Sequence, residues 1–392
     1  MNRHFSHTLK LISLAALAAV AMGCEDEDND NLQGNWKNTY KYFLGSPRGG
    51  AVGFQLMVGD TLRAFVGTGA NMTNSKTQER FADFYMFTYT PAGLTETVRY
   101  DRLTEAERQG GVPCTKAVAS LPVASGAKPR NGGVGFALNG KGYVGLGFDG
   151  SDCLNDFWCY DPAANSWSQA PSYPGDAVRN AFAFVIDNVA YVGGGEDADN
   201  NIIGDFYRFD GQTWEPLQNI GIPRSQASAF VCNGMGYVYG GTNGGKVVAF
   251  ERYNPKVADW EPLHHLKDAT EEAFDDQYGQ LAGYGATAFV LDDNTADCRA
   301  YVTTGGPNGN GQLTWEYNPF NDTWIQKTSF EGGARKFAVS FVLNANINNH
   351  GWRQTGFVTT GGTSDLLVSG SGGLYYADTW AFLPDEAWEE RD

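Results

Sequence analysis

The sequence predicts an all-β protein, a six-bladed β-propeller with four antiparallel strands in each blade. Three recurring features predict it: a glycine cluster that ends an apolar run, an aromatic run a few residues later, and a lone Trp beyond a turn. The glycine clusters are Gly67-Thr68-Gly69, Gly145-Leu146-Gly147, Gly193-Gly194-Gly195, Gly240-Gly241, Gly305-Gly306 and Gly361-Gly362. Six units in the same order indicate six repeats of one small β-sheet.

The clearest unit, residues 128–171, shows why each repeat contains four strands. Asn139-Gly140 separates two apolar runs, and this dipeptide suits the left-handed backbone of a two-residue hairpin turn. The aromatic run at 157–160 gives a third strand, and a turn with Pro162 and Asn165 leads to a fourth strand at Trp167. The runs are too short for helices and alternate little between apolar and polar, as expected when neighbouring sheets cover both faces.

The same signature can be followed through the other units. The aromatic runs are Asp83-Phe84-Tyr85, Asp156-Phe157-Trp158, Asp205-Phe206-Tyr207, residues 250–253, Trp315-Glu316-Tyr317 and Asp378-Thr379-Trp380, and the later tryptophans are Trp167, Trp214, Trp260, Trp324 and, less clearly, Trp388. This set resembles the Kelch repeat, found in the galactose oxidase central-domain superfamily, over residues 36–388. The resemblance implies propeller blades.

Two details stay open at the ends of the repeat array. The first unit has no obvious fourth-strand Trp; residues 95–128 take its place, with a charged and potentially helical piece at 104–109. Residues 35–37 resemble the end of a repeat, and we expect them to complete the last blade by pairing the two chain ends. Residues 387–389 compete for that position.

The N-terminus predicts export. Residues 1–23 carry two cations and then a 12-residue apolar run, which is typical of a signal peptide and short of the roughly 20 residues of a membrane-spanning helix. Ala21-Met22-Gly23-Cys24 resembles a bacterial lipobox, which implies lipidation of Cys24; a plain secretory signal is the alternative. Residues 24–34 form an acidic tether, and their acids resemble the signal that sends some Gram-negative lipoproteins to the cell surface. We therefore expect an outer-membrane lipoprotein with one propeller domain at 35–392.

The net charge and the cysteine content limit the kinds of ligand and cross-link that we expect. The net charge is −17, and removing residues 1–23 with their two cations makes it −17 − 2 = −19. Such an acidic chain repels phosphate backbones, so we expect no nucleic acid, and membrane contact through the lipid alone. Without Cys24 five cysteines remain; Cys153 and Cys159 could pair, although buried free thiols are an equal alternative. No spacing indicates a zinc site, and we expect no metal and no cofactor.

Functional residues are expected where fourth-to-first and second-to-third strand loops share one face. The first loop class repeats an arginine: Arg48, Arg130, Arg179, Arg224 and Arg335, with Gly283-Tyr284 at the corresponding place of the fifth unit. Five arginines and Tyr284 would surround the axis and bind a carboxylate, a sulfate or an acidic sugar. In the alternative, each arginine pairs with an Asp or carbonyl of its own blade.

The second loop class supplies acids, amides and aromatics, which suit sugar hydroxyls and rings. Its members are Asp149, Asp152, Glu196, Asp197, Asp199, Asn200, Asn308, Asn310, Asp365, Tyr375 and Tyr376. Residues 196–200 could hold calcium, but no loop matches a full calcium-binding pattern. For any one of these residues, a solvated loop residue is the favoured interpretation.

Two enzyme classes are relevant to a propeller with these loops. A copper oxidase of the galactose oxidase type is disfavoured, because the chain after residue 23 has only His264, His265 and His350, and no Tyr-His pair. A second resemblance, to N-acetylneuraminate epimerase, implies a sialic-acid mutarotase with an acid, a base and a cation. Glu196 with Arg179 or Arg224 are the candidate residues.

We expect a surface module that binds a glycan or a protein partner rather than an enzyme. Sialic-acid mutarotase activity and a structural role in a surface complex are the alternatives.

Overall fold

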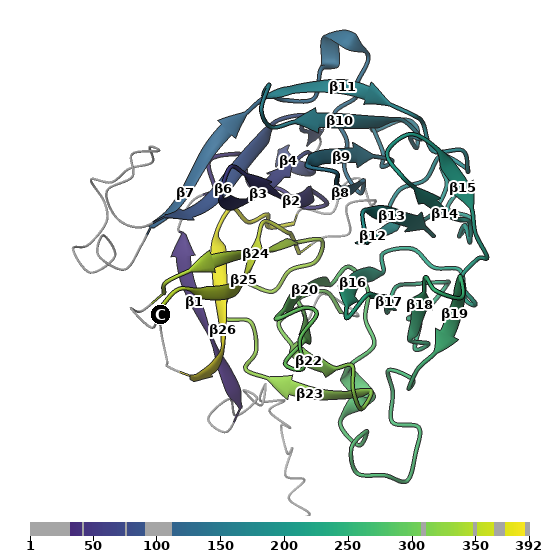
Figure 1. Ribbon diagram of the computed structural model, residues 1–392, viewed down its shortest axis with the longest axis vertical. Helices are drawn as coiled ribbons and strands as arrows, with labels where there is room; N and C mark the ends of the chain where they lie inside the picture. Colours follow the sequence, from purple (N-terminus) through teal and green to yellow (C-terminus); the bar gives the residue numbers. More distant parts are fainter. Residues whose placement is uncertain are drawn as a thin grey trace, which may run out of the picture.

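The computed structural model describes residues 32–40, 43–74, 77–90, 112–306, 311–347, 351–363 and 373–388. Figure 1 shows six sheets arranged around a common axis, each with four antiparallel strands. Blades 1 to 3 contain β2 (Val52–Val58), β3 (Thr61–Gly67), β6 (Phe84–Thr90) and β7 (Val112–Val118); β8 (Val134–Leu138), β9 (Lys141–Gly145), β10 (Phe157–Asp161) and β11 (Ser166–Ala170); and β12 (Phe182–Ile186), β13 (Val189–Gly193), β14 (Phe206–Phe209) and β15 (Trp214–Pro216).

The remaining strands build blades 4 to 6. They are β16 (Ser228–Cys232), β17 (Met235–Tyr239), β18 (Glu251–Asn254) and β19 (Asp259–Pro262); β20 (Thr287–Leu291), β21 (Arg299–Thr303), β22 (Thr314–Asn318) and β23 (Thr323–Lys327); and β24 (Val339–Ala345), β25 (Arg353–Thr359), β26 (Thr379–Ala387) and β1 (Gln33–Tyr40). The predicted all-β, six-bladed propeller is confirmed. Short 3₁₀ turns lie at Val123–Ser125 (η3) and Tyr278–Gln280 (η4).

The hairpin chemistry read from the sequence is present in blade 2. Asn139 and Gly140 both have left-handed backbones, with φ of 50° and 74°, and they join β8 to β9 in the register Leu138↔Lys141. This is the geometry that a two-residue turn requires.

The chain ends meet in blade 6, which settles the open question of closure. β1 forms the outer strand and pairs with β26, so the N-terminal strand completes the last blade (Figure 1). Trp36 on β1 is fully buried and its ring lies 4.8 Å from that of Phe330. Trp388 follows β26 and is not on a fourth strand.

The first unit carries the departure expected from its sequence. Its fourth strand is β7, which lacks a Trp, and its second-to-third strand loop contains an extra hairpin, β4 (Ala70–Asn74) and β5 (Thr77–Arg80). The potentially helical piece at 104–109 lies outside the described residues, as do the signal segment, Cys24 and the tether up to residue 31. No helix among the described residues is long and apolar enough to cross a membrane.

Aromatic side chains form the core between blades. Phe54 of blade 1, for example, has ring contacts with Tyr160 and Trp167 of blade 2, at 6.3 and 6.5 Å between centroids. Burying one such side chain contributes about 1.5–3 kcal/mol. The blades are therefore held together by apolar surface that a single isolated sheet would leave exposed.

Two closed rings of backbone hydrogen bonds surround the axis. In the first, a left-handed residue before each inner strand donates its N–H to its counterpart in the preceding blade: Gly50 to Phe337, Gly132 to Gly50, Asn180 to Gly132, Gln226 to Asn180, Gly285 to Gln226 and Phe337 to Gly285. In the second, a glycine after each second strand donates to the next blade: Gly69 to Arg130, Gly147 to Val178, Gly195 to Arg224, Gly241 to Gly283, Gly305 to Arg335 and Gly361 to Arg48.

The second ring explains the repeated glycine. Gly147 has a φ of +95°, and a Cβ there would lie 2.8 Å from the carbonyl oxygen of Asn131. A side chain at this position would be strained and would collide with the neighbouring loop. The rings also define equivalent positions in all six blades, independently of sequence alignment.

Candidate functional site

Four of the repeated arginines form ion pairs inside their own blades. Arg130 is fully buried and binds Asp156 through two bonds, Nη1 to Oδ1 at 2.6 Å and Nη2 to Oδ2 at 2.9 Å. It also donates to the carbonyls of Lys128 and Leu146. Burial alone would raise the pKa of Asp156, but the hydrogen bonds and charge of Arg130 hold that pKa below its ordinary value.

Blades 1, 4 and 6 repeat this arrangement. The pairs are Arg48 with Asp83, Arg224 with Glu251, and Arg335 with Asp378. In blade 4 the carboxylate comes from two positions later on the third strand, and the backbone carbonyl of Ala249 accepts from Arg224 instead. The pKa of Glu251 is raised by burial despite the nearby Arg224 charge, whereas the pKa of Asp378 is lowered.

Each of these four arginines therefore pairs with groups of its own blade, which is the alternative considered from the sequence. They are Arg48, Arg130, Arg224 and Arg335. All four side chains have 0% exposure, and their guanidinium groups are bonded to carboxylates and backbone carbonyls. The structure therefore does not assemble them as a ring open to a ligand. The physical reason is that each repeated arginine is itself fully buried and needs the partly buried Asp, or the buried Glu251, as its counter-charge.

Arg179 and Tyr284 differ from these four, because they lie one residue later in their loops. In the second hydrogen-bond ring, the carbonyls of Val178 and Gly283 accept where those of the four arginines do. The sequence carries this signal: the inner-strand Phe follows Arg130 by six residues, at Phe136, but follows Arg179 by five, at Phe184. Counting to this Phe separates the two kinds of arginine.

We call the residues that bridge the loops around this end of the axis the axial set. It takes up to three equivalent positions from each blade, identified by isolated β-bridges, by the Ala70↔Arg80 pair of β4 and β5, and by the backbone bond from Gly306 to Tyr284. Its members are Gly49, Ala70 and Arg80; Asn131, Phe148 and Cys153; Arg179, Glu196 and Ile202; Ser225, Thr242 and Lys246; Tyr284 and Gly306; and Lys336, Gly362 and Tyr375.

The axial set is positively charged in an acidic protein. It contains four cations, Arg80, Arg179, Lys246 and Lys336, and one carboxylate, Glu196, for a formal charge of 4 − 1 = +3. The whole chain has a net charge of −17. The same loops also carry Asp149, Asp152, Asp197 and Asp199, so the cations are concentrated at the bridging positions and not in the loops as a whole.

Arg179 and Glu196 form the central polar contact of the set. Arg179 Nε donates to Glu196 Oε1 at 3.1 Å, and Glu196 also accepts from Asn180 Nδ2 at 2.9 Å and from Ser225 Oγ at 3.4 Å. Both ionic side chains are buried, with 7% exposure each. The structure thus joins Glu196 with Arg179, whereas Arg224, the other candidate, is bound to Glu251.

Arg80 was missed by sequence reasoning. It lies on β5, the extra hairpin of blade 1, and reaches blade 2, where its Nε donates to Asn131 Oδ1 at 2.8 Å. Its guanidinium carbon lies 5.0 Å from the centroid of Phe148, and that of Arg179 lies 4.9 Å from the same ring. Arg80 lies on a hairpin inserted into blade 1 that has no repeat signature, so no motif marked it.

The predicted loop residues have varied roles. Asp149 and Asp197 accept backbone N–H groups of their own loops, which explains them as turn residues. Asp152 and Asp199 are exposed, and Asn200 accepts from Arg179 Nη2 at 2.7 Å. The guanidinium carbon of Arg335 lies 3.9 Å from the centroid of the Tyr376 ring. Asn308, Asn310, Asp365 and His350 lie outside the described residues.

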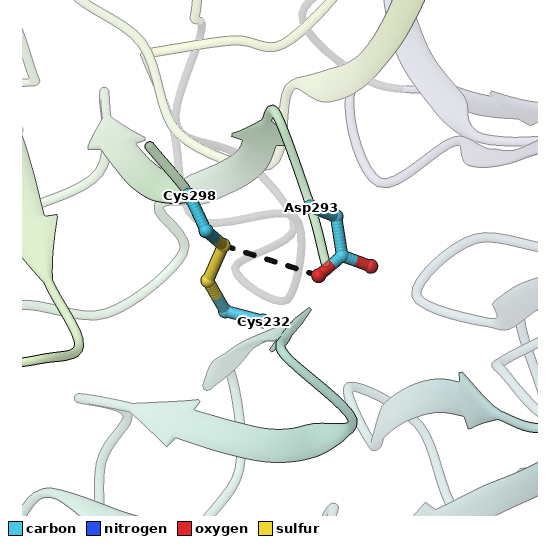
Figure 2. Close-up of side chains that lie close together, drawn as sticks. All are labelled: Cys232, Asp293 and Cys298. Atoms are coloured by element: carbon cyan, nitrogen blue, oxygen red, sulfur yellow. Dashed lines mark hydrogen bonds between the residues drawn. A yellow bond between two sulfur atoms is a disulfide. The ribbon is translucent and has the colours of Figure 1, made fainter. Parts of the chain in front are cut away.

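The histidines and cysteines do not form a metal centre among the described residues. His264 packs on Phe274 and His265 is exposed. One group, Cys232, Asp293 and Cys298, has ligand atoms within 4.8 Å of one another, but its two sulfurs are joined in a disulfide (Figure 2). Joined sulfurs are not the thiolates that bind metals.

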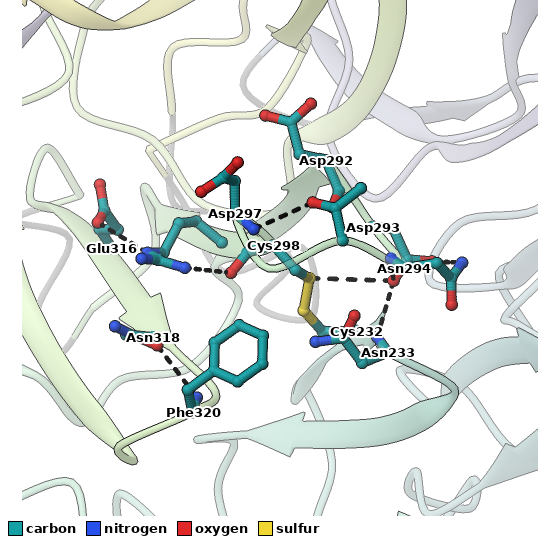
Figure 3. The surroundings of a disulfide bond; sticks show 12 residues. Cys232, Asn233, Asp292, Asp293, Asn294, Asp297, Cys298, Glu316, Asn318 and Phe320 are labelled. Carbon is teal, nitrogen blue, oxygen red and sulfur yellow. Dashed lines mark hydrogen bonds and ion pairs between the residues drawn. A yellow bond between two sulfur atoms is a disulfide. The ribbon is translucent and has the colours of Figure 1, made fainter.

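The disulfide links blade 4 to blade 5. Cys232 ends β16, and Cys298 immediately precedes β21, with Asp293 accepting the backbone N–H of Asn233 beside it (Figure 3). The pairing considered from sequence is absent, because Cys153 and Cys159 are free thiols. Burial raises the pKa of Cys153 to about 11, so it is a poor nucleophile near neutral pH.

Comparisons with known proteins agree with this architecture. A family model for the Kelch motif matches residues 147–172, from the second-ring glycine of blade 2 to just past its fourth strand. No curated protein matches the chain by sequence. A solved structure titled "Structure of YjhT" matches with a TM-score of 0.58 and 15% identity, covering 86% of this chain and 95% of that one. The chain is thus a six-bladed β-propeller that carries a Kelch motif and is similar in fold to YjhT.

Proposed function

We propose that this protein is a surface binding module that recognises a negatively charged glycan at the axial set. The observation that carries the proposal is that the bridging positions themselves hold four cations and one carboxylate, on a chain with a net charge of −17. Carboxylate or sulfate groups on a sugar are the ligands that such a site favours.

Aromatic groups of the axial set, and an amide on the loop beside Arg179, suit the rest of a sugar. Tyr284 is half-buried, and the amine of Lys336 lies 4.7 Å from its ring centroid. Phe148 is also half-buried, and Asn200 on the loop beside Arg179 is exposed. Ring faces stack on sugar rings, and amides bond hydroxyls, so one site would hold both parts of an acidic sugar.

The test is a glycan panel that contains sialylated, sulfated and neutral oligosaccharides, probed with the purified protein at low and physiological salt. We expect binding to acidic glycans that weakens with salt, and a loss of roughly tenfold or more in Arg179→Met, from the loss of charged hydrogen bonds. Arg208→Met is the matched control, since Arg208 is an exposed arginine of blade 3 on β14. Equal binding to neutral glycans, or none to any glycan, would sink this proposal.

A mutarotase is the second candidate, favoured by one observation. Glu196 is the single carboxylate of the axial set and contacts Arg179, which supplies an acid-base group beside a cation. Three donors hold the Glu196 carboxylate in place beside Arg179. Saturation-transfer NMR on N-acetylneuraminate anomers decides this: exchange that Glu196→Gln abolishes supports catalysis, and wild-type exchange at the buffer rate rejects it.

We also propose that the protein is exported and anchored to the outer membrane through a lipid on Cys24, facing the cell surface. The sequence of residues 1–30 supports this, and the Cys232–Cys298 disulfide is typical of exported proteins. Metabolic labelling with a fatty acid should mark the wild type and not Cys24→Ser. Surface protease treatment of whole cells should then remove the protein. If the glycan panel is negative, pull-down from surface fractions tests a protein partner or a surface complex.

A further inference from the structure

We infer that Arg80 and Arg179 form a two-guanidinium clamp that binds one anionic group over Phe148. This deepens the proposed function, on which it rests, by identifying where the negative group of the glycan binds. It also assigns a binding role to Arg80, a residue outside the repeat pattern.

The geometry brings the two guanidinium groups to one aromatic ring from two different blades. Arg80 comes from blade 1 and Arg179 from blade 3, and their guanidinium carbons lie 5.0 and 4.9 Å from the centroid of Phe148 in blade 2. Two cations that share one ring repel each other, and the attraction of each to the ring face offsets only part of that repulsion.

The partners of Arg80 leave its charge without a carboxylate partner among the described residues. Its Nε donates to Asn131 Oδ1 at 2.8 Å and its Nη2 to Gln78 Oε1 at 2.7 Å, and both acceptors are neutral amides. Arg179 shares its charge with Glu196. The four structural arginines, by contrast, each bind a carboxylate directly.

One carboxylate, that of Asp149, acts on Arg80 without bonding to it. Burial lowers the pKa of Arg80 below its ordinary value, the charge of Asp149 opposes that change, and the charge of Arg179 adds to it. Asp149 Oδ1 instead accepts the backbone N–H groups of Ser151 and Asp152, at 2.8 and 2.9 Å. An anion bonded directly to the Arg80 head would therefore add a contact that this carboxylate does not make.

The exposure of the side chains indicates that an anion would approach the clamp from the side of Arg80. Arg80 and Phe148 are half-buried, whereas Arg179 is buried. The hydrogen bonds to Asn131 and Gln78 hold the Arg80 head in place, so little ordering is needed on binding. A carboxylate or sulfate that contacts both guanidinium groups would reduce the repulsion between them. A single exposed arginine has no such repulsion to relieve, so it would bind the anion less strongly.

The experiment compares three probes on the whole protein by calorimetry: the methyl glycoside of N-acetylneuraminate, its neutral methyl ester, and inorganic sulfate. We expect the acid to bind, the ester to bind at least tenfold more weakly, and Arg80→Gln to weaken acid binding by roughly tenfold while leaving ester binding unchanged. Arg80→Lys should retain part of the affinity, and Arg208→Gln all of it. Unchanged thermal unfolding verifies that each variant is folded.

The outcomes separate this inference from the proposed function. If the wild type binds the acid and Arg80→Gln binds it equally well, the clamp is rejected and the glycan proposal stands. If no sugar binds, the proposed function fails, and sulfate titration followed through the arginine Nε–H signals tests the clamp alone. Saturable shifts of two signals, one of them missing in Arg80→Gln, support the clamp; their absence overturns it.

Discussion

Arg130 and Arg179 precede the first strands of neighbouring blades, yet Arg130 makes its contacts within one blade and Arg179 also contacts the adjacent blade. Arg130 is fully buried, donates four hydrogen bonds within blade 2, and its charge is matched by Asp156. Arg179 donates two, to Glu196 and Asn200, and its guanidinium also lies on Phe148 of the adjacent blade. One side chain fastens a blade, and the other joins blades around the axis.

A shift of one residue separates the two roles. In blade 3 Val178 occupies the place of Arg130, and Arg179 the place of Asn131. Asp205 is still present at the start of the third-strand run, as Asp156 is in blade 2, but no arginine pairs with it among the described residues. Blade 3 has therefore exchanged a structural ion pair for a charged axial contact.

The largest effect should come from breaking a structural pair. Arg130→Met leaves Asp156 partly buried without its cation, and we expect a loss of about 3 kcal/mol in the free energy of unfolding, at the lower end for buried pairs because Asp156 is 22% exposed. Arg179→Met should cost about as much, since it leaves Glu196, which is 7% exposed, without its cation. Urea unfolding of both variants measures these losses. An Arg130→Met variant as stable as the wild type would contradict the structural role of the Arg130–Asp156 pair.

The next effect concerns blade 5, which lacks the structural pair altogether. Gly283 stands at its arginine position, and the Cys232–Cys298 disulfide fastens it to blade 4. Replacing both cysteines by serine should lower the free energy of unfolding by about 2–4 kcal/mol, because the cross-link restricts the unfolded chain. Cys159→Ser, which removes a free thiol, is the control. Equal stability of both variants under non-reducing conditions would show that the disulfide does not hold the blades together.

Sequence reasoning identified the scaffold far better than the site. Glycine clusters, Asn139-Gly140 and the aromatic strands report local backbone needs that recur six times, so together they predict six blades correctly. The site depends on contacts between blades: Arg80 meets Phe148 across an insertion, and Glu196 meets Ser225 of the next blade. Contacts between blades produce no regular residue spacing that could be recognised in the sequence. Arg179 was found, but it was grouped with arginines of another role.

The pH dependence of stability should differ between the Arg130–Asp156 pair and the Arg224–Glu251 pair. The pKa of Asp156 is lowered in the folded protein, so its stabilisation is present above the ordinary pKa near 3.8 and is lost as pH falls below it. The pKa of Glu251 is raised by burial, so its contribution is greatest below 4.5 and declines as pH rises through the folded pKa.

The corresponding variants should therefore show opposite slopes. Relative to the wild type, Asp156→Asn should become less stable as pH rises from 3 to 6, by up to about 1.4 kcal/mol per unit of pKa shift, and Glu251→Gln should become more stable. Urea midpoints across this range measure both. Parallel curves would mean that the two pairs are electrostatically alike.

The smallest effect is expected for an exposed pair on the outer strands. Arg208 and Glu215 contact each other with 48% and 55% exposure. Arg208→Met should change the free energy of unfolding by less than about 1 kcal/mol and leave glycan binding intact. Thermal unfolding and the glycan panel measure this, and a large loss of binding would show that arginine in general, rather than the axial set, determines recognition.

The most direct test moves the blade 2 pattern into blade 3. The double substitution Val178→Arg with Arg179→Asn restores an arginine opposite Asp205 and removes the axial cation. We predict a folded protein whose stability changes by no more than about 3 kcal/mol, the usual limit for a larger side chain in a packed site, and whose affinity for acidic glycans falls at least tenfold. Wild-type affinity in this variant, measured by calorimetry, would contradict the claim that the one-residue shift creates the binding site.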